Sequence, residues 1–191
     1  ATLTVKITED IVLNGVNQFN DEVAWTFACW MYWNGTSSSY FVGDDGSTHS
    51  HLAFHSGRYL VFRSEGGDHF RWTNTTLLEA STWYRVVIVA STDTTLTAYV
   101  NGVQYGSTLT ASSTAYDGSN PTLTAEGGTK HEFTGWGMPY SSGGIRSSGL
   151  DGMMSDGQVW DAAWTADDAL YDYLNPEQLA LNRGGTSLTN S

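Results

Sequence analysis

The stretch from Trp83 to Gly102 constrains the fold most, because it predicts two β-strands joined by a short polar turn. Its first half, residues 83–90, is rich in β-branched and aromatic side chains, which favour strands. Its second half, residues 96–100, alternates apolar residues with Thr and Tyr, as a strand with one buried face does. The dipeptide Asn-Gly that ends the stretch supplies the positive φ angles of tight turns. An antiparallel hairpin that continues into another turn is therefore expected.

Other parts of the chain carry weaker signals of the same kind. Short apolar runs separated by glycine-containing turns predict an antiparallel meander between residues 51 and 72. Residues 2–14 predict strand structure that ends at Asn14-Gly15. Residues 106–149 are rich in Gly, Ser and Thr and have little apolar periodicity, so they are expected to form loops.

Three further segments agree with the same fold, and the order of all these segments along the chain is typical of one family. They are an aromatic-rich strand at 25–31, a strand at 150–160 and a short helix at 165–171. Together with the hairpin they resemble laminin G-like domains of the concanavalin A-like jelly-roll superfamily. The late strand departs from the family pattern, because only Asp156 remains of an acidic pair. Thr165 is placed to cap the helix, with Asp168 three residues on.

The resemblance covers most of residues 20–174 and implies a fold class. We expect an all-β, two-sheet antiparallel β-sandwich, a concanavalin A-like jelly roll, with one short C-terminal helix. A chain of 191 residues with few charges fits one domain of this size. Residues 1–174 are predicted to form that domain, with 1–19 as an N-terminal strand or arm. Residues 175–191 are predicted to be a C-terminal arm or linker.

Charge and composition exclude several classes of protein. The net charge of −12 would repel phosphate backbones, so no direct nucleic-acid binding is expected. No window approaches the roughly 20 apolar residues of a membrane helix, and the first residues show no secretion signal. Cys29 is the only cysteine, which rules out an intrachain disulfide and suggests a small buried apolar side chain.

The sequence does not predict an enzyme. Relatives that hydrolyse glycosides carry two carboxylates on one strand as Glu-x-Asp-x-x-Glu, and no Glu-x-Asp occurs in this chain. A glycoside hydrolase remains the third alternative, with carboxylates brought together from distant strands.

Candidate binding residues lie in the predicted loops, since loops on a rigid sandwich often carry binding sites. Tyr116, Asp117, Trp136 and Tyr140 are the first choice. The alternative is that these aromatic rings fold back over the sandwich edge. Asp44, Asp45 and Asp117 could supply oxygen ligands to Ca²⁺, but their Asp-Gly dipeptides are equally typical of turns without an ion.

The two ends of the chain suggest a function. Residues 7–15 and 175–191 are similar to segments of laminin G-like modules in tailed-phage virion proteins. This second resemblance implies a non-enzymatic virion protein, a capsid decoration, tail or fibre module, assembled in the host cytoplasm. Its partners would be other virion proteins, copies of itself and cell-surface glycans. The alternative is a carbohydrate-binding module or lectin, with or without Ca²⁺, in which a loop aromatic stacks on a sugar.

Overall fold

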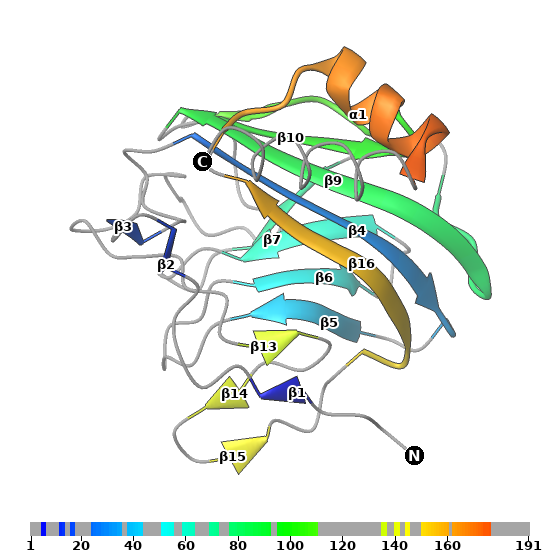
Figure 1. Cartoon of the computed structure of the whole chain (residues 1–191). Coiled ribbons are helices and arrows are strands. Elements are labelled where there is room, and N and C mark those ends of the chain that lie inside the picture. The colour runs from blue at the N-terminus through cyan, green and yellow to red at the C-terminus, as the bar shows by residue number, and fades with distance from the viewer. Residues whose placement is uncertain are drawn as a thin grey trace.

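The computed structural model describes residues 5–6, 12–13, 16–17, 24–35, 38–43, 51–55, 59–63, 69–72, 77–92, 95–110, 135–136, 140–141, 144–145, 150–160 and 162–176. Over these residues the chain forms two larger antiparallel sheets packed face to face, with one helix near the C-terminal end (Figure 1). The predicted two-sheet sandwich with a short C-terminal helix is therefore confirmed.

The first sheet, called sheet I, contains β1 (Val5–Lys6), β13 (Gly135–Trp136), β5 (Ser38–Gly43), β6 (His51–His55), β7 (Tyr59–Arg63) and β8 (His69–Arg71), in spatial order. The second, called sheet II, contains β11 (Val103–Gln104), β10 (Thr95–Val100), β9 (Thr82–Thr92), β4 (Trp25–Trp33) and β16 (Gly152–Trp160), with β12 (Leu109–Thr110) also paired to β10. Two short pairs, β2 (Val12–Leu13) with β3 (Val16–Asn17) and β14 (Tyr140–Ser141) with β15 (Gly144–Ile145), and helix α1 (Ala166–Leu174) complete the described elements.

The core lies between the two sheets and depends on strand alternation. Alternate residues of β4 and β9 point inward because successive side chains leave a strand on opposite faces. They meet Leu52 and Leu60 of sheet I. The inward residues of these two strands are Trp25, Phe27, Cys29, Met31, Trp33, Val86, Ile88 and Ala90. Burial raises the pKa of the Cys29 thiol well above its ordinary value, so Cys29 behaves as the expected small apolar side chain.

The structure confirms the elements predicted with the clearest signals. The hairpin is formed by β9 and β10, and the following Asn101 and Gly102 both have positive φ, at 50° and 75°. The meander is formed by β6, β7 and β8, and the aromatic-rich and late segments form β4 and β16. Thr165 and Asp168 cap α1 with reciprocal hydrogen bonds.

The region expected to consist of loops, residues 106–149, also contains strands. β12, β13, β14 and β15 all fall within it. Each has only two residues, so no apolar periodicity reveals it, and β13 pairs with β1 and β5 from distant parts of the sequence. The N-terminal segment likewise pairs with this region, through β1.

Helix α1 covers part of the outer face of sheet II (Figure 1). Its buried Ala169 packs with outward side chains of the sheet, among them Val87 and Tyr99. The segment before the helix is anchored by Thr26, whose hydroxyl donates to the carbonyl of Ala162 at 2.7 Å and accepts from the backbone nitrogen of Trp164 at 2.9 Å. Within the described part of the chain, no helix is both long and apolar enough to cross a membrane.

A fully buried arginine ties the helix to the sheet. Arg85 lies on the outer face of β9, and its Nε and Nη2 atoms donate to the two carboxylate oxygens of Asp172 on α1, at 2.6 and 2.9 Å. Both side chains are inaccessible to solvent. The Nη1 atom donates to the backbone carbonyl of Asp156 at 2.9 Å and lies 3.0 Å from its carboxylate. Charge-assisted pairs of this bidentate kind are the strongest hydrogen bonds in proteins.

A β-bulge brings Asp156 to this arginine. Ser155 pairs with Trp30 and Gln158 pairs with Ala28, so two residues of β16 stand opposite one residue of β4. Asp156 adopts a positive φ of 48° within the bulge. Strict alternation would turn its carboxylate toward the core, whereas the bulge turns it to Arg85. The acidic residue retained from the family pattern thus stabilises the helix–sheet contact.

Gly152 cannot carry a side chain, because a methyl group there would overlap the carbonyl oxygen of Tyr32 in the neighbouring strand. We expect Gly152→Ala to lower the free energy of unfolding by about 2 kcal/mol, which lowers Tm by about 5 °C in a chain of this size. Calorimetry measures the shift. Ser155→Ala, at an exposed position of the same strand, is the control and should leave Tm nearly unchanged. Equal shifts in both variants would contradict the steric argument.

Arg85→Met leaves the buried Asp172 carboxylate without the Arg85 cation, and Asp172→Leu leaves the buried Arg85 with Asp156 alone. Arg85→Met or Asp172→Leu alone should therefore each lower the free energy of unfolding by about 3–5 kcal/mol. The double variant removes both charges and should be more stable than either single variant. Denaturant unfolding of the three variants tests this, and a double variant as unstable as the sum of the singles would refute it.

Candidate functional site

Two of the four binding residues predicted from the loops lie outside the described residues, and the other two are described by their backbone. Tyr116 and Asp117 are the two that lie outside. The backbone of Trp136 belongs to β13, inside sheet I between β1 and β5, and Tyr140 begins β14. These two residues are thus in strands and not in the loops where they were expected. The binding role of all four stays a prediction.

The calcium prediction also concerns residues that the structure does not describe, namely Asp44, Asp45 and Asp117. Among the described residues, no group of three His, Cys, Asp or Glu side chains is placed to hold a metal ion. Two carboxylates that do come together there, Asp156 and Asp172, are bound to Arg85. We therefore base the site on other side chains.

The outer face of sheet II, beyond the end of α1, carries a row of three exposed or half-buried apolar side chains. Met153 of β16 pairs with Tyr32 of β4, which in turn pairs with Trp83 of β9. Trp83 is 40% exposed and Met153 is 49% exposed, although each is large and apolar. The rings of Tyr32 and Trp83 lie 5.6 Å apart at 54°. We call these three residues the aromatic row.

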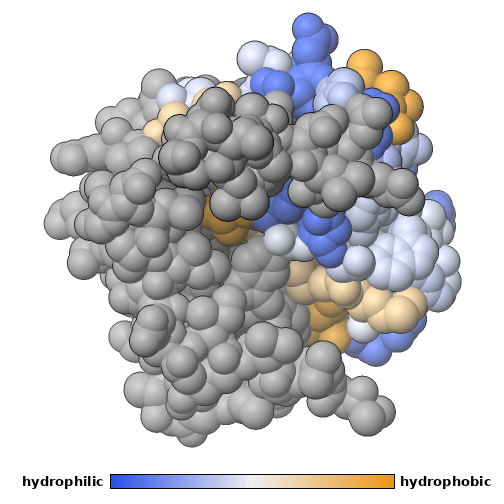
Figure 2. All heavy atoms as spheres, in the orientation of Figure 1, coloured by the Kyte–Doolittle hydropathy of each residue, from blue (hydrophilic) through white to orange (hydrophobic). Residues whose placement is uncertain are grey.

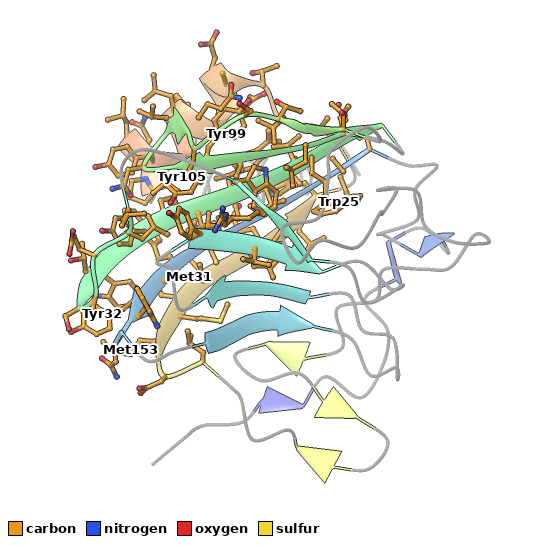
Figure 3. All side chains as sticks on the ribbon, turned by 180° about the vertical axis from the view of Figure 1, so that it is seen from behind. Trp25, Met31, Tyr32, Tyr99, Tyr105 and Met153 are labelled. Atoms are coloured by element: carbon orange, nitrogen blue, oxygen red, sulfur yellow. The ribbon has the colours of Figure 1, made fainter. Side chains whose placement is uncertain are left out.

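The figures show where the row lies in the molecule. In Figure 3, Tyr32 and Met153 lie beside each other at one end of sheet II, whereas Met31 lies between the two sheets. In Figure 2, near-white and pale-orange atoms meet at the right-hand side, where β4 ends and β9 and β16 begin in Figure 1. The row is therefore at the surface and at the end of the sheet.

Polar groups border the row at the strand ends. The side-chain amide of Asn34 donates to the Asp151 carboxylate at 3.0 Å, and the Asn34 backbone nitrogen donates to the Asp151 carbonyl at 2.9 Å. Both residues are exposed. The turn that precedes β9 is held against the end of β4, since the backbone nitrogen of Ser81 donates to the carbonyl of Trp33 at 2.6 Å. An amide and a carboxylate thus lie two register positions from the aromatic row, with the Trp33–Gly152 pair between them.

The opposite border of the row is the helix. Trp30, the next outward residue of β4, lies 6.0 Å from the ring of Tyr173 on α1 and 6.0 Å from the guanidinium of Arg85. Because Arg85 and Asp172 hold α1 in place, Trp30 is partly covered while Tyr32 and Trp83 are left outside the helix. The helix-docking contacts therefore determine where the exposed part of the sheet begins.

This arrangement suits a ligand that has both apolar faces and polar edges. Aromatic faces attract C–H groups and planar apolar surfaces, and adjacent polar side chains orient hydroxyl or amide groups. A second set of exposed apolar side chains, on α1 and β11, differs because it is mostly aliphatic: Val103, Leu170, Tyr171 and Leu174. Orange atoms at the upper right of Figure 2, where α1 lies in Figure 1, belong to this separate area.

Sequence reasoning missed the aromatic row. The alternation of Trp30 and Tyr32 along one strand was visible, but it also fits a buried face. Tyr32, Trp83 and Met153 come from three distant segments, and only the strand register brings them together. An exposed Met153 on the late strand carries no signal of its own.

Comparisons with known proteins agree on the fold. Among solved structures, the native heptameric SAP-like pentraxin of Limulus polyphemus matches with a TM-score of 0.56 and 18% identity, over 80% of this chain and 71% of that one. A candidate carbohydrate-binding protein from Bacteroides ovatus matches with a TM-score of 0.51 and 17% identity, over 78% of this chain and 40% of that one. The botulinum neurotoxin serotype D binding domain matches with a TM-score of 0.56 and 11% identity, over 91% of this chain and 40% of that one. At these identities the matches establish a concanavalin A-like jelly-roll fold and nothing finer.

Sequence comparison is more specific about the family. No curated protein matches the sequence significantly. A family model described as "Concanavalin A-like lectin/glucanases superfamily", of the Laminin_G_3 type, matches residues 7–169. That range includes every described strand of both sheets except β1, together with the first turn of α1. The chain therefore belongs to the concanavalin A-like lectin/glucanases superfamily.

Proposed function

We propose that this protein binds carbohydrate through the aromatic row. The observation that carries the proposal is the placement of Trp83, Tyr32 and Met153 in register on an exposed sheet face. Asn34 and Asp151 lie two positions further along their strands. A pyranose ring offers a flat C–H face for stacking and hydroxyl groups at its edges. The row and its polar border match both parts of that chemistry.

Two further points support a binding role. Large exposed apolar side chains that cluster on a surface typically mark an interaction site. The family includes lectins, and one similar structure is a candidate carbohydrate-binding protein. The binding role is a feature of the site and not of the fold, since one fold supports many functions.

We also propose that binding takes place without catalysis. The chain has no Glu-x-Asp-x-x-Glu motif, and the polar border of the row offers one carboxylate, Asp151, among the described residues. Glycoside hydrolysis ordinarily needs two carboxylates on either side of the bond. Similar structures include a Trypanosoma rangeli sialidase, but this chain spans 24% of it.

A role in a phage particle is a second proposal, which rests on the resemblance of residues 7–15 and 175–191 to virion modules. These segments lie almost entirely outside the described residues, and the family match does not refer to phages. Glycan binding and a virion role are compatible, because a virion module can attach to host glycans. Mass spectrometry of purified virions tests the second proposal, and absence of the chain from particles would end it.

The aromatic row makes a direct prediction about affinity. Trp83→Ala should weaken binding of a glycan by about 1–2 kcal/mol, or roughly tenfold in Kd, because it removes the exposed stacking face. Glycan-array screening identifies a ligand for the unaltered protein, and titration calorimetry then compares the variants. Circular dichroism checks that the Trp83→Ala variant is folded like the unaltered protein.

Tyr171→Ala provides the matched control, since Tyr171 is an exposed aromatic residue on α1 outside the row. It should leave Kd unchanged. Equal losses in both variants would locate binding elsewhere, and a flat array response of the unaltered protein would remove the proposal.

A further inference from the structure

Over the residues that the structure describes, the aromatic row is an open platform and not an enclosed pocket. Met153 lies on β16, the edge strand of sheet II. On the other side β10 ends at Val100, level with Val86, so no described strand continues beside Trp83. The row crosses three adjacent strands and is therefore about 10 Å long, or two strand spacings. Two linked sugar rings have a similar length, and a chain could pass beyond both ends.

The charges around the row are negative. Asp151 is exposed at its polar border, and the hydrogen bond from the uncharged Asn34 amide does not cancel its charge. The whole chain, Asp151 included, has a net charge of −12. A ligand on the row therefore meets a negative potential.

No described cation offsets this potential. Of the side chains that the structure describes, Arg71 and Arg85 are the cationic ones. Arg85 is fully buried and bound to Asp172 and Asp156. Arg71 belongs to sheet I, where its guanidinium lies 4.4 Å from the centre of the Tyr59 ring. Neither can pair with an anionic group of a ligand on the row.

We infer that the row selects neutral, linear glycan chains, binding an internal stretch of at least two sugar units, and disfavours glycans that carry carboxylates. This inference rests on the proposed carbohydrate-binding function and adds the ligand class. The flat, open row accounts for the preference for chains over single sugars. Asp151 and its acidic surroundings account for the preference for neutral ligands.

The experiment uses the full chain and two forms of one ligand. Calorimetry first measures binding of cello-, laminari-, malto- and xylo-hexaose and of the matching mono- and disaccharides. Affinity should rise sharply from one sugar unit to two. The best hexose-based hexaose is then compared with its C6-oxidised derivative, which has the same backbone but carries carboxylates.

The oxidised form should bind roughly fivefold to tenfold more weakly in 20 mM salt, because like charges a few ångströms apart repel in water. The difference should shrink in 0.5 M salt, where charges are screened. Asp151→Asn keeps the shape of the side chain but removes its charge. It should reduce the difference in affinity between the neutral and the oxidised hexaose about fivefold. Asp167→Asn, an exposed position on α1 outside the row, is the control and should leave the difference nearly unchanged.

Two results would overturn the inference while leaving carbohydrate binding intact. One is equal or tighter binding of the oxidised form, and the other is a preference that responds neither to salt nor to Asp151→Asn. Affinity for a monosaccharide equal to that for the hexaose would refute the chain-binding part. Absence of binding to every neutral and oxidised glycan would instead remove the proposed function, and this inference with it.

Discussion

Pairing of β4 with β9 is the constraint on which the rest of the structure depends. The two strands pair without interruption from Trp25 with Ala90 to Trp33 with Thr82. Because side chains alternate, this single register sends Phe27 and Ile88 into the core and turns the residues between them outward. A slip of one strand by one residue would reverse its faces and bury a different set of side chains. Both the core and the helix-covered face follow from the same pairing.

The same register buries Arg85, and removing this charged side chain from water costs free energy. A guanidinium taken out of water needs partners that satisfy its charge and its hydrogen bonds. Asp172 reaches it from α1, and Asp156 reaches it through the bulge in β16. One charged side chain thus explains the position of the helix, the irregularity of an edge strand and the retention of a single acidic residue from the family pattern.

The same contacts define the proposed binding surface. α1 covers sheet II as far as Trp30 and Tyr173, and the aromatic row begins at Tyr32, the next outward residue of β4. Its rings project from paired strands, so little conformational freedom remains to be lost on binding. Such preorganisation favours affinity because ordering a flexible surface costs free energy. Acidic neighbours then shape which ligands this surface accepts.

The sequence by itself determined the local elements and the fold class. Apolar alternation in 83–90 and 96–100, the positive-φ turn at Asn101-Gly102 and the cap at Thr165 are all signals carried by neighbouring residues, and each is confirmed. The order of these elements was enough to indicate the superfamily. Two-residue strands such as β13 were not predicted from the sequence, since a pattern needs more than two residues to be recognised.

Tertiary structure alone decided which outward residues meet. Alternation shows that Arg85 and Val87 share a face, but it does not show that Asp172, on a helix far along the chain, covers one and not the other. The aromatic row depends on pairing between Tyr32, Trp83 and Met153, which lie at least 51 positions apart in sequence. Their contact is a property of strand register, and register is set by the cooperative packing of the whole core rather than by any one segment.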